Sequence, residues 1–187
     1  MLTKKSVLIA ICFLVMQITM GDAVVHVNET LGDFRISFDA SNDTNMIGKY
    51  WNTTGSGVFG SLPHINISNA YMVVAGNINS KNTRWSGVAV LISKEPINTS
   101  YIEENLFKNS TVSYIREEDR VIDGHQGVLA FSGNGPEDPL MNYTAFYWLD
   151  ETSGMATQLV AAIAQLPWNE GAETLINTTH VEDTSKK

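Results

Sequence analysis

The chain has 187 residues, with 12 basic and 20 acidic side chains and a net charge of −8 at pH 7. Nucleic acid and anionic lipid are poor partners for it, because proteins that neutralise phosphates carry a stripe of Lys and Arg. Here the basic residues are scattered singly along the chain.

Residues 1–23 have the features of a secretory signal. Lys4 and Lys5 precede an unbroken apolar run over residues 7–16. Two small residues, Gly21 and Ala23, then stand at the third and the first position before a possible cleavage site after Ala23. This order predicts cleavage there. The apolar run is shorter than the roughly 20 residues that span a bilayer, so an uncleaved signal anchor that tethers the protein to the membrane is the alternative.

Removal of the signal leaves 164 residues, which carry 10 basic and 19 acidic side chains. This length is enough for one domain, residues 24–187, that buries about 70% of its unfolded surface. The only cysteine, Cys12, leaves with the signal, so no internal disulfide can form. The expected location is extracellular or at the cell surface.

Asp33 to Asp39 alternate between apolar and polar side chains, which predicts a half-buried strand. Oxygen-bearing side chains then follow at alternate positions, as at the start of a calcium loop, namely Asp39, Ser41, Asp43 and Asn45. Thr44 and Tyr50 replace the Gly and the bidentate Glu that such a loop needs. A polar turn is therefore predicted, and a calcium- or solute-binding module is the alternative.

Residues 41–68 are rich in Gly and contain Tyr50, Trp51 and Phe59, with no clear period. Long irregular segments are often binding loops or insertions. The favoured prediction is that these rings tuck under the loop as a satellite of the core. The alternative is an exposed aromatic platform for a carbohydrate or another partner.

Apolar runs at Tyr71–Gly76 and Trp85–Ser93 predict inner strands. Ser100 and Glu103 have the spacing of a capping box, which predicts a short helix through Leu106.

Two hairpins are predicted next. Arg120–Ile122 and Gln126–Phe131 flank Asp123-Gly124, a dipeptide suited to positive φ in a tight turn. Tyr143–Leu149 and Met155–Gln165 flank a turn at residues 151–154.

The chain closes with a predicted helix from about Glu170 to Asn177, whose inward face holds Ala172, Leu175 and Ile176. An extended piece at Thr179–Glu182 and a polar tail at residues 183–187 follow. The predicted fold class is α+β, with a mostly antiparallel β-sheet packed with helices.

The mature chain contains eight N-x-Ser/Thr triplets, which accept glycans only in export compartments. These glycosylation candidates are Asn28, Asn42, Asn52, Asn66, Asn98, Asn109, Asn142 and Asn177.

The C-terminal third resembles a known family. The residues concerned are Val121 to Val128, Tyr143 to Trp148 and a Pro167-Trp168-Asn169-Glu170-Gly171 segment that leads to Thr179-His180-Val181-Glu182. They resemble the closing section of PsbP-like domains in archaeal secreted proteins, over roughly residues 112–182. The resemblance implies a PsbP-like α/β/α sandwich and a non-catalytic binding role, without carrying over any family partner.

Motifs for chemistry are absent from the sequence: it contains no G-x-S-x-G elbow, no H-E-x-x-H and no phosphate-binding glycine loop. His125, beside the predicted turn, is expected to be a solvated surface residue rather than part of a hydrolase triad. His26, His64 and His180 lack metal-ligand spacing. No catalytic residue, cofactor or metal site is predicted. The sequence favours a secreted, glycosylated, non-catalytic domain that binds an envelope protein or glycan, with an unrecognised extracellular hydrolase as the second alternative.

Overall fold

The computed structural model describes residues 24–52, 65–77, 85–102, 114–133, 142–165 and 171–186. The predicted signal, residues 1–23, lies outside them. The described strands form two antiparallel sheets. Sheet A has three strands in the order β1 (Val25–Leu31), β2 (Phe34–Ala40) and β10 (His180–Asp183).

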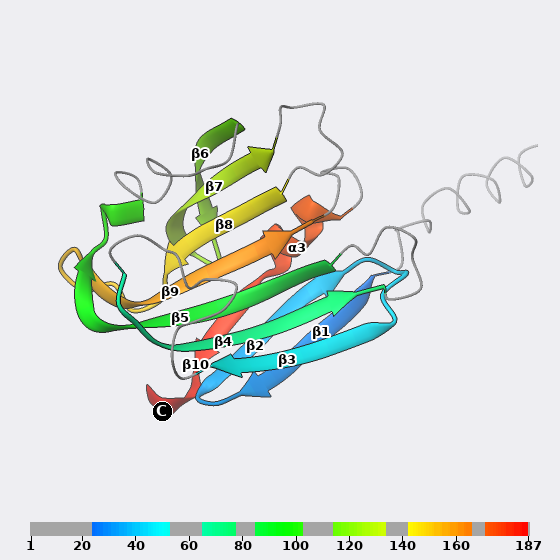
Figure 1. Ribbon diagram of the computed structural model, residues 1–187, viewed down its shortest axis with the longest axis horizontal. Coiled ribbons are helices and arrows are strands. Elements are labelled where there is room, and N and C mark those ends of the chain that lie inside the picture. The colour runs from blue at the N-terminus through cyan, green and yellow to red at the C-terminus, as the bar shows by residue number, and fades with distance from the viewer. Residues whose placement is uncertain are drawn as a thin grey trace, which may run out of the picture.

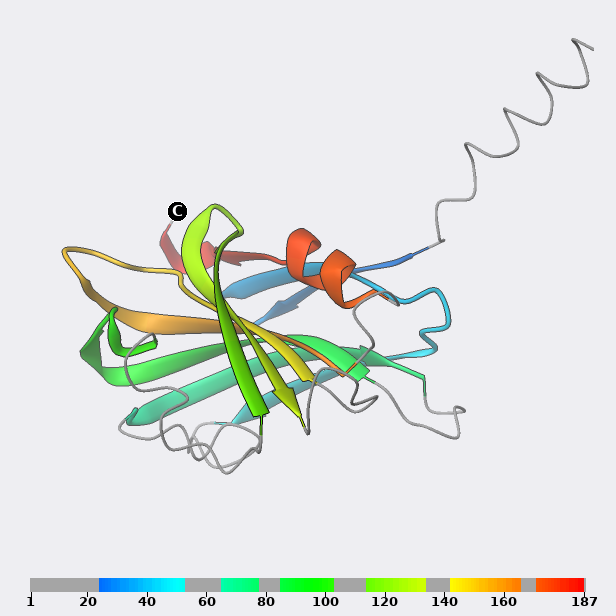
Figure 2. The same ribbon diagram turned by 90° about the horizontal axis from the view of Figure 1, so that it is seen from above.

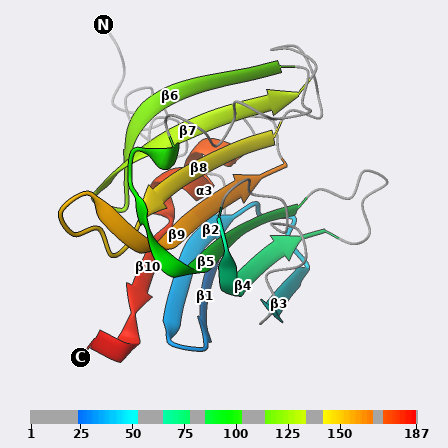
Figure 3. The same ribbon diagram turned by 60° about the vertical axis from the view of Figure 1, so that its left-hand side comes forward.

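Sheet B has seven strands, and β3 and β6 form its opposite edges (Figures 1 and 3). Its order is β3 (Met46–Asn52), β4 (Ile67–Gly76), β5 (Trp85–Asn98), β9 (Met155–Ala164), β8 (Asn142–Trp148), β7 (His125–Gly133) and β6 (Tyr114–Ile122). The helix α3 (Ala172–Thr178) precedes β10, and the 3-10 helix η2 (Thr184–Lys186) follows it.

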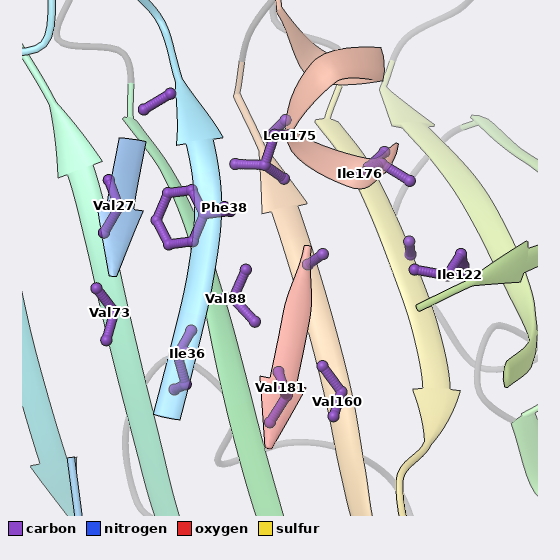
Figure 4. Packing of buried hydrophobic residues seen from close by; sticks show 14 of the residues in the cluster. Val27, Ile36, Phe38, Val73, Val88, Ile122, Val160, Leu175, Ile176 and Val181 are labelled. Atoms are coloured by element: carbon purple, nitrogen blue, oxygen red, sulfur yellow. The ribbon is translucent and has the colours of Figure 1, made fainter. Parts of the chain in front are cut away.

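Sheet A and α3 together form a layer over one face of sheet B (Figure 2). Period-two alternation in β2 places Phe34, Ile36 and Phe38 inward, and all three are buried. They pack with buried valines of sheet B, as Figure 4 shows for Val73, Val88 and Val160. Leu175 and Ile176 of α3 extend the same cluster.

A second buried cluster lies on the opposite face of sheet B. It contains Leu91, Phe146, Trp148 and Leu159, and Tyr101 and Ile102 pack against these strands. The Trp148 indole Nε1 donates a hydrogen bond to the Thr99 carbonyl at 3.1 Å. Because both faces of β5, β8 and β9 are covered, these strands carry the long apolar runs seen in the sequence.

Both predicted hairpins are confirmed. Asp123 and Gly124 have φ values of 53° and 79° between β6 and β7, and Ser153 and Gly154 have 54° and 77° between β8 and β9. These positive values explain the turn residues, since only Gly and, less readily, short polar residues adopt them.

Other predicted elements are found as well. The strand at Asp33–Asp39 is β2, the inner strands lie within β4 and β5, and the C-terminal helix is α3, with Ala172, Leu175 and Ile176 buried. Tyr101 and Ile102 are helical, whereas the remainder of the predicted capping-box helix lies outside the described residues.

The predicted fold class is wrong. The described residues are mostly β, in two antiparallel sheets with one complete helix, and they do not form an α+β sheet packed with helices or a PsbP-like α/β/α sandwich. The cover on the inner face of sheet B is mainly a second sheet, because β1 and β10 both pair with β2. No helix in the described ranges has the length and apolarity to cross a bilayer.

Candidate functional site

The edge strand β3 carries large aromatic side chains that face solvent. Tyr50 is 57% exposed and Trp51 is 64% exposed. The prediction that these two rings tuck under a loop is therefore wrong, and Phe59 lies outside the described residues. The segment 46–52 forms a strand because Tyr50 and Trp51, which favour β-structure, stand together in it. As an edge strand it pairs with one neighbour, β4.

The Trp51 ring is supported from the side of the core. It lies parallel to the Tyr71 ring of β4, with 3° between the planes and 6.4 Å between the centroids. Tyr71 in turn packs against buried Phe34, with 5.4 Å between the centroids. We call Trp51 and Tyr71, with Phe34 beneath them, the aromatic stack. It runs from the core to the surface.

Gly32, in the turn between β1 and β2, makes room for this stack. A Cβ atom at position 32 would lie 2.6 Å from Cε1 of Tyr71, and the φ of Gly32 is +60°. Both the space and the backbone conformation therefore require glycine here. The first hairpin of the chain and β4 thus jointly fix the position of the Tyr71 ring.

The charged side chain closest in sequence to Trp51 is compensated by an ion pair. Lys49 lies on the same face of β3 as Trp51, two residues away. Its Nζ donates to Glu29 Oε2 of β1 at 2.9 Å, so the edges of the two sheets are joined by an ion pair. A lysine at an edge strand also discourages pairing with another chain.

The outward face of sheet A is polar. Across this face His26 and Asp39 lie 2.8 Å apart, and Arg35 and Glu182 lie 3.1 Å apart. Exposed ion pairs of this kind contribute little to stability, since solvent screens them and their side chains lose entropy. The face has no counterpart to the rigid stack at β3.

A half-buried hydrogen-bond centre lies at the Asp123 turn. The Asp123 carboxylate accepts hydrogen bonds from the Tyr147 hydroxyl at 2.9 Å and the Val181 amide at 2.9 Å, and lies 2.7 Å from His180 Nδ1. Burial raises the pKa of the Tyr147 phenol, and the neighbouring carboxylate raises it further. His125 is half-buried, because its ring stacks on Tyr147 with 5.1 Å between the centroids, and is therefore only partly solvated.

Ser37 completes a Ser, His and Asp neighbourhood on sheet A, because it pairs with His180 in the β2–β10 register. In the described part of the chain, however, no side-chain hydrogen bond joins Ser37 to the His180 ring. Acyl transfer needs that contact to activate the hydroxyl, together with donors for the developing oxyanion. The hydrogen bond from the Val181 amide to Asp123 ties the β6–β7 turn to β10.

The oxygen-bearing side chains at positions 39, 43 and 45, which the sequence offered as the start of a calcium loop, do not point toward a common ion position. Asp39 pairs with His26 on sheet A, whereas Asp43 Oδ2 accepts a hydrogen bond from Asn77 at 3.2 Å. Asn45 Nδ2 donates to the same Asn77 side chain at 3.1 Å. Within the described ranges, no group of three or more His, Cys, Asp and Glu side chains could hold a metal ion.

The glycosylation candidates lie on strands of both sheets, on α3 and in segments between the strands. Of those described, five are exposed and Asn142 is half-buried; the exposed ones are Asn28, Asn42, Asn66, Asn98 and Asn177. Asn98 Oδ1 accepts hydrogen bonds from Ser100. The Asn177 side chain accepts from Arg120 and donates to Glu173. Asn109 and the side chain of Asn52 lie outside the described residues, and glycosylation stays a prediction.

Comparison with known proteins finds no matching family model, no matching curated protein and no matching solved structure. The resemblance of the C-terminal third to PsbP-like domains therefore stays a prediction. Sequence reasoning missed β3 as a strand, although Tyr50 and Trp51 in succession favour one. It also missed the role of Asp123, whose partners lie 24, 57 and 58 residues away and leave no local signal.

Proposed function

We propose that the protein is an exported, non-catalytic recognition domain that binds a partner of the extracellular space or cell envelope through the aromatic stack. The N-terminal signal pattern and the eight glycosylation triplets support the export. The acidic composition supports a partner other than nucleic acid or anionic lipid.

One observation carries the proposal: Trp51 is 64% exposed and yet is held parallel to Tyr71. Exposing an indole to water forgoes the free energy that its burial would give, so an exposed ring in a fixed position marks a contact surface. Because the ring is already oriented, a partner that covers it spends little further side-chain entropy on binding.

The two alternatives have weaker support. Calcium binding by the considered loop would require Asp39 and Asp43 to turn toward one ion, but they contact different neighbours. Hydrolysis would require an activated nucleophile, and Ser37 has no hydrogen bond to the His180 ring in the described part of the chain.

The test is sedimentation of the secreted protein with envelopes isolated from the cells that produce it. Wild type is expected to sediment with the envelopes, and Trp51→Ala is expected to stay in the supernatant. Val121→Ala is the matched control, since Val121 is 65% exposed on β6, at the opposite edge of sheet B. Equal sedimentation of wild type and Trp51→Ala would refute the proposal.

A further inference from the structure

We infer that the partner of the aromatic stack is a neutral glycan, whose pyranose rings lie on the exposed face of Trp51. This inference rests on the proposed function and specifies its ligand. Three features of the described residues carry it: the flat exposed ring of Trp51, its fixed orientation and the compensated charge of Lys49 beside it.

The shape of the site suits a flat apolar ligand face. Trp51 lies on β3 at the edge of the sheet, with one side of its ring toward Tyr71 and more than half of its surface open to solvent. One face of a pyranose presents several C–H groups in a plane, and these groups carry partial positive charge. They therefore match the negative π-face of an indole in both size and charge.

The orientation of the ring is set before binding. Phe34 is 2% exposed and anchors Tyr71, and Tyr71 in turn fills the space that Gly32 leaves open. Individual sugars gain little free energy from each contact, because water competes for their hydroxyl groups. A ring that needs no ordering is therefore an advantage for a glycan, in which many weak contacts repeat along the chain.

The local charge favours a neutral ligand. Lys49, the charged residue nearest to Trp51 in sequence, already pairs with Glu29 at 2.9 Å, so its charge is compensated and is not left to select an anionic partner. These two side chains are partly exposed, at 47% and 32%, and offer donors and acceptors to sugar hydroxyls at the rim. The chain's net charge of −8 disfavours acidic polysaccharides further.

The experiment is affinity electrophoresis of the secreted protein through gels that contain mannan, a soluble β-glucan, a galactan or polygalacturonate. We expect at least one neutral polysaccharide to retard the protein and polygalacturonate to leave its mobility unchanged. Trp51→Ala is expected to weaken the retardation about tenfold or more, as loss of a central aromatic contact does, and Trp51→Phe to weaken it less. Val121→Ala should migrate as wild type does.

Treatment of the envelopes separates failure of this inference from failure of the proposed function. Periodate, which cleaves sugar diols, is expected to abolish Trp51-dependent sedimentation, and protease treatment to leave it intact. If protease abolishes sedimentation, periodate spares it and no neutral polysaccharide retards the protein, the partner is a protein and the glycan inference is wrong, although the recognition function stands. If Trp51→Ala sediments as wild type does and no gel retards wild type, both are wrong.

Discussion

The Asp123 carboxylate joins three segments that lie far apart in the sequence. It sits in the β6–β7 turn and receives hydrogen bonds from Tyr147 on β8 and from the backbone of Val181 on β10. Tyr147 is fully buried. Leaving a buried hydroxyl without an acceptor costs more free energy than the hydrogen bond itself contributes to stability. Asp123 therefore matters to the fold mainly as a hydrogen-bond acceptor and less as a negative charge.

Replacing Asp123 is expected to reveal this role. Asp123→Ala should lower the free energy of unfolding by about 2 to 4 kcal/mol, because the Tyr147 hydroxyl and the Val181 amide both lose their acceptor. Asp123→Asn keeps one acceptor oxygen and a residue that tolerates positive φ, so it should cost less. Urea unfolding at pH 7 measures both.

The control for this prediction is His180→Ala. The His180 side chain is 59% exposed, and an exposed ion pair contributes less than about 1 kcal/mol. A loss as large as that of Asp123→Ala would mean that the His180 ring, rather than the buried hydroxyl, makes Asp123 important.

The conformation or role of a single residue was predictable from the sequence where it depends only on neighbouring residues in the chain. Asp123 and Gly124 were placed in a turn correctly, since the turn itself requires positive φ. The exposure of Trp51 was not predictable, because the same ring would be buried if a further strand lay beside β3. The three partners of Asp123 depend in the same way on tertiary pairing.

Among the elements, the C-terminal segment after β10 differs most from the structure predicted for it. Residues 183–187 were expected to be a polar tail, but the Asp183 side chain is only 6% exposed and ends β10. The Thr184 amide donates to the Asp33 carbonyl at 2.8 Å, so the start of η2 is attached to the β1–β2 turn. This segment closes sheet A rather than trailing from it.

Asp183 gives this segment a dependence on pH. Burial opposes its ionisation, but hydrogen bonds from Ser185, Gln158 and Lys186 outweigh burial and lower the pKa of Asp183 from 3.8 to about 2. A carboxyl group whose pKa is lower in the folded state stabilises the fold above its unfolded pKa. That contribution is lost as the pH falls from about 4 through about 2.

We therefore expect Asp183→Asn to be less stable than wild type at pH 5 and the difference to shrink as the pH approaches 2. The measurement is urea unfolding across this range, with Asp119→Asn, at an exposed position of β6, as the control. A difference that stays constant from pH 5 to pH 2 would show that ionised Asp183 does not stabilise the segment.

The strongly periodic elements were predictable, whereas two of the four edge strands, β1 and β3, were not. β2 and α3 show clear periods of two and of three to four residues, and both were assigned correctly. β1 and β3 lie at sheet edges, where one neighbour is absent and exposed polar or aromatic residues interrupt the apolar pattern. Without β1 and β3 the prediction contained only one sheet. Helices were then the only elements left to cover its apolar face, which led to the wrong fold class.

At the scale of the molecule, the export prediction has a direct test. The sequence predicts that the secreted protein begins at Val24, since small residues precede the cut and the apolar run is too short to span a bilayer. N-terminal sequencing of the protein from culture medium is expected to start at Val24. Met1 retained on membrane-bound protein would instead establish the signal anchor.

Sheet A is built from both ends of the chain, since Ser37 of β2 pairs with His180 of β10. The first hairpin, β1 and β2, is therefore synthesised long before its third strand, β10. Closing so long a loop is entropically costly, which slows folding, and until then one edge of β2 is open to pairing with other chains. That edge of β2 stays open in every copy of the protein until β10 has been made and has paired with it.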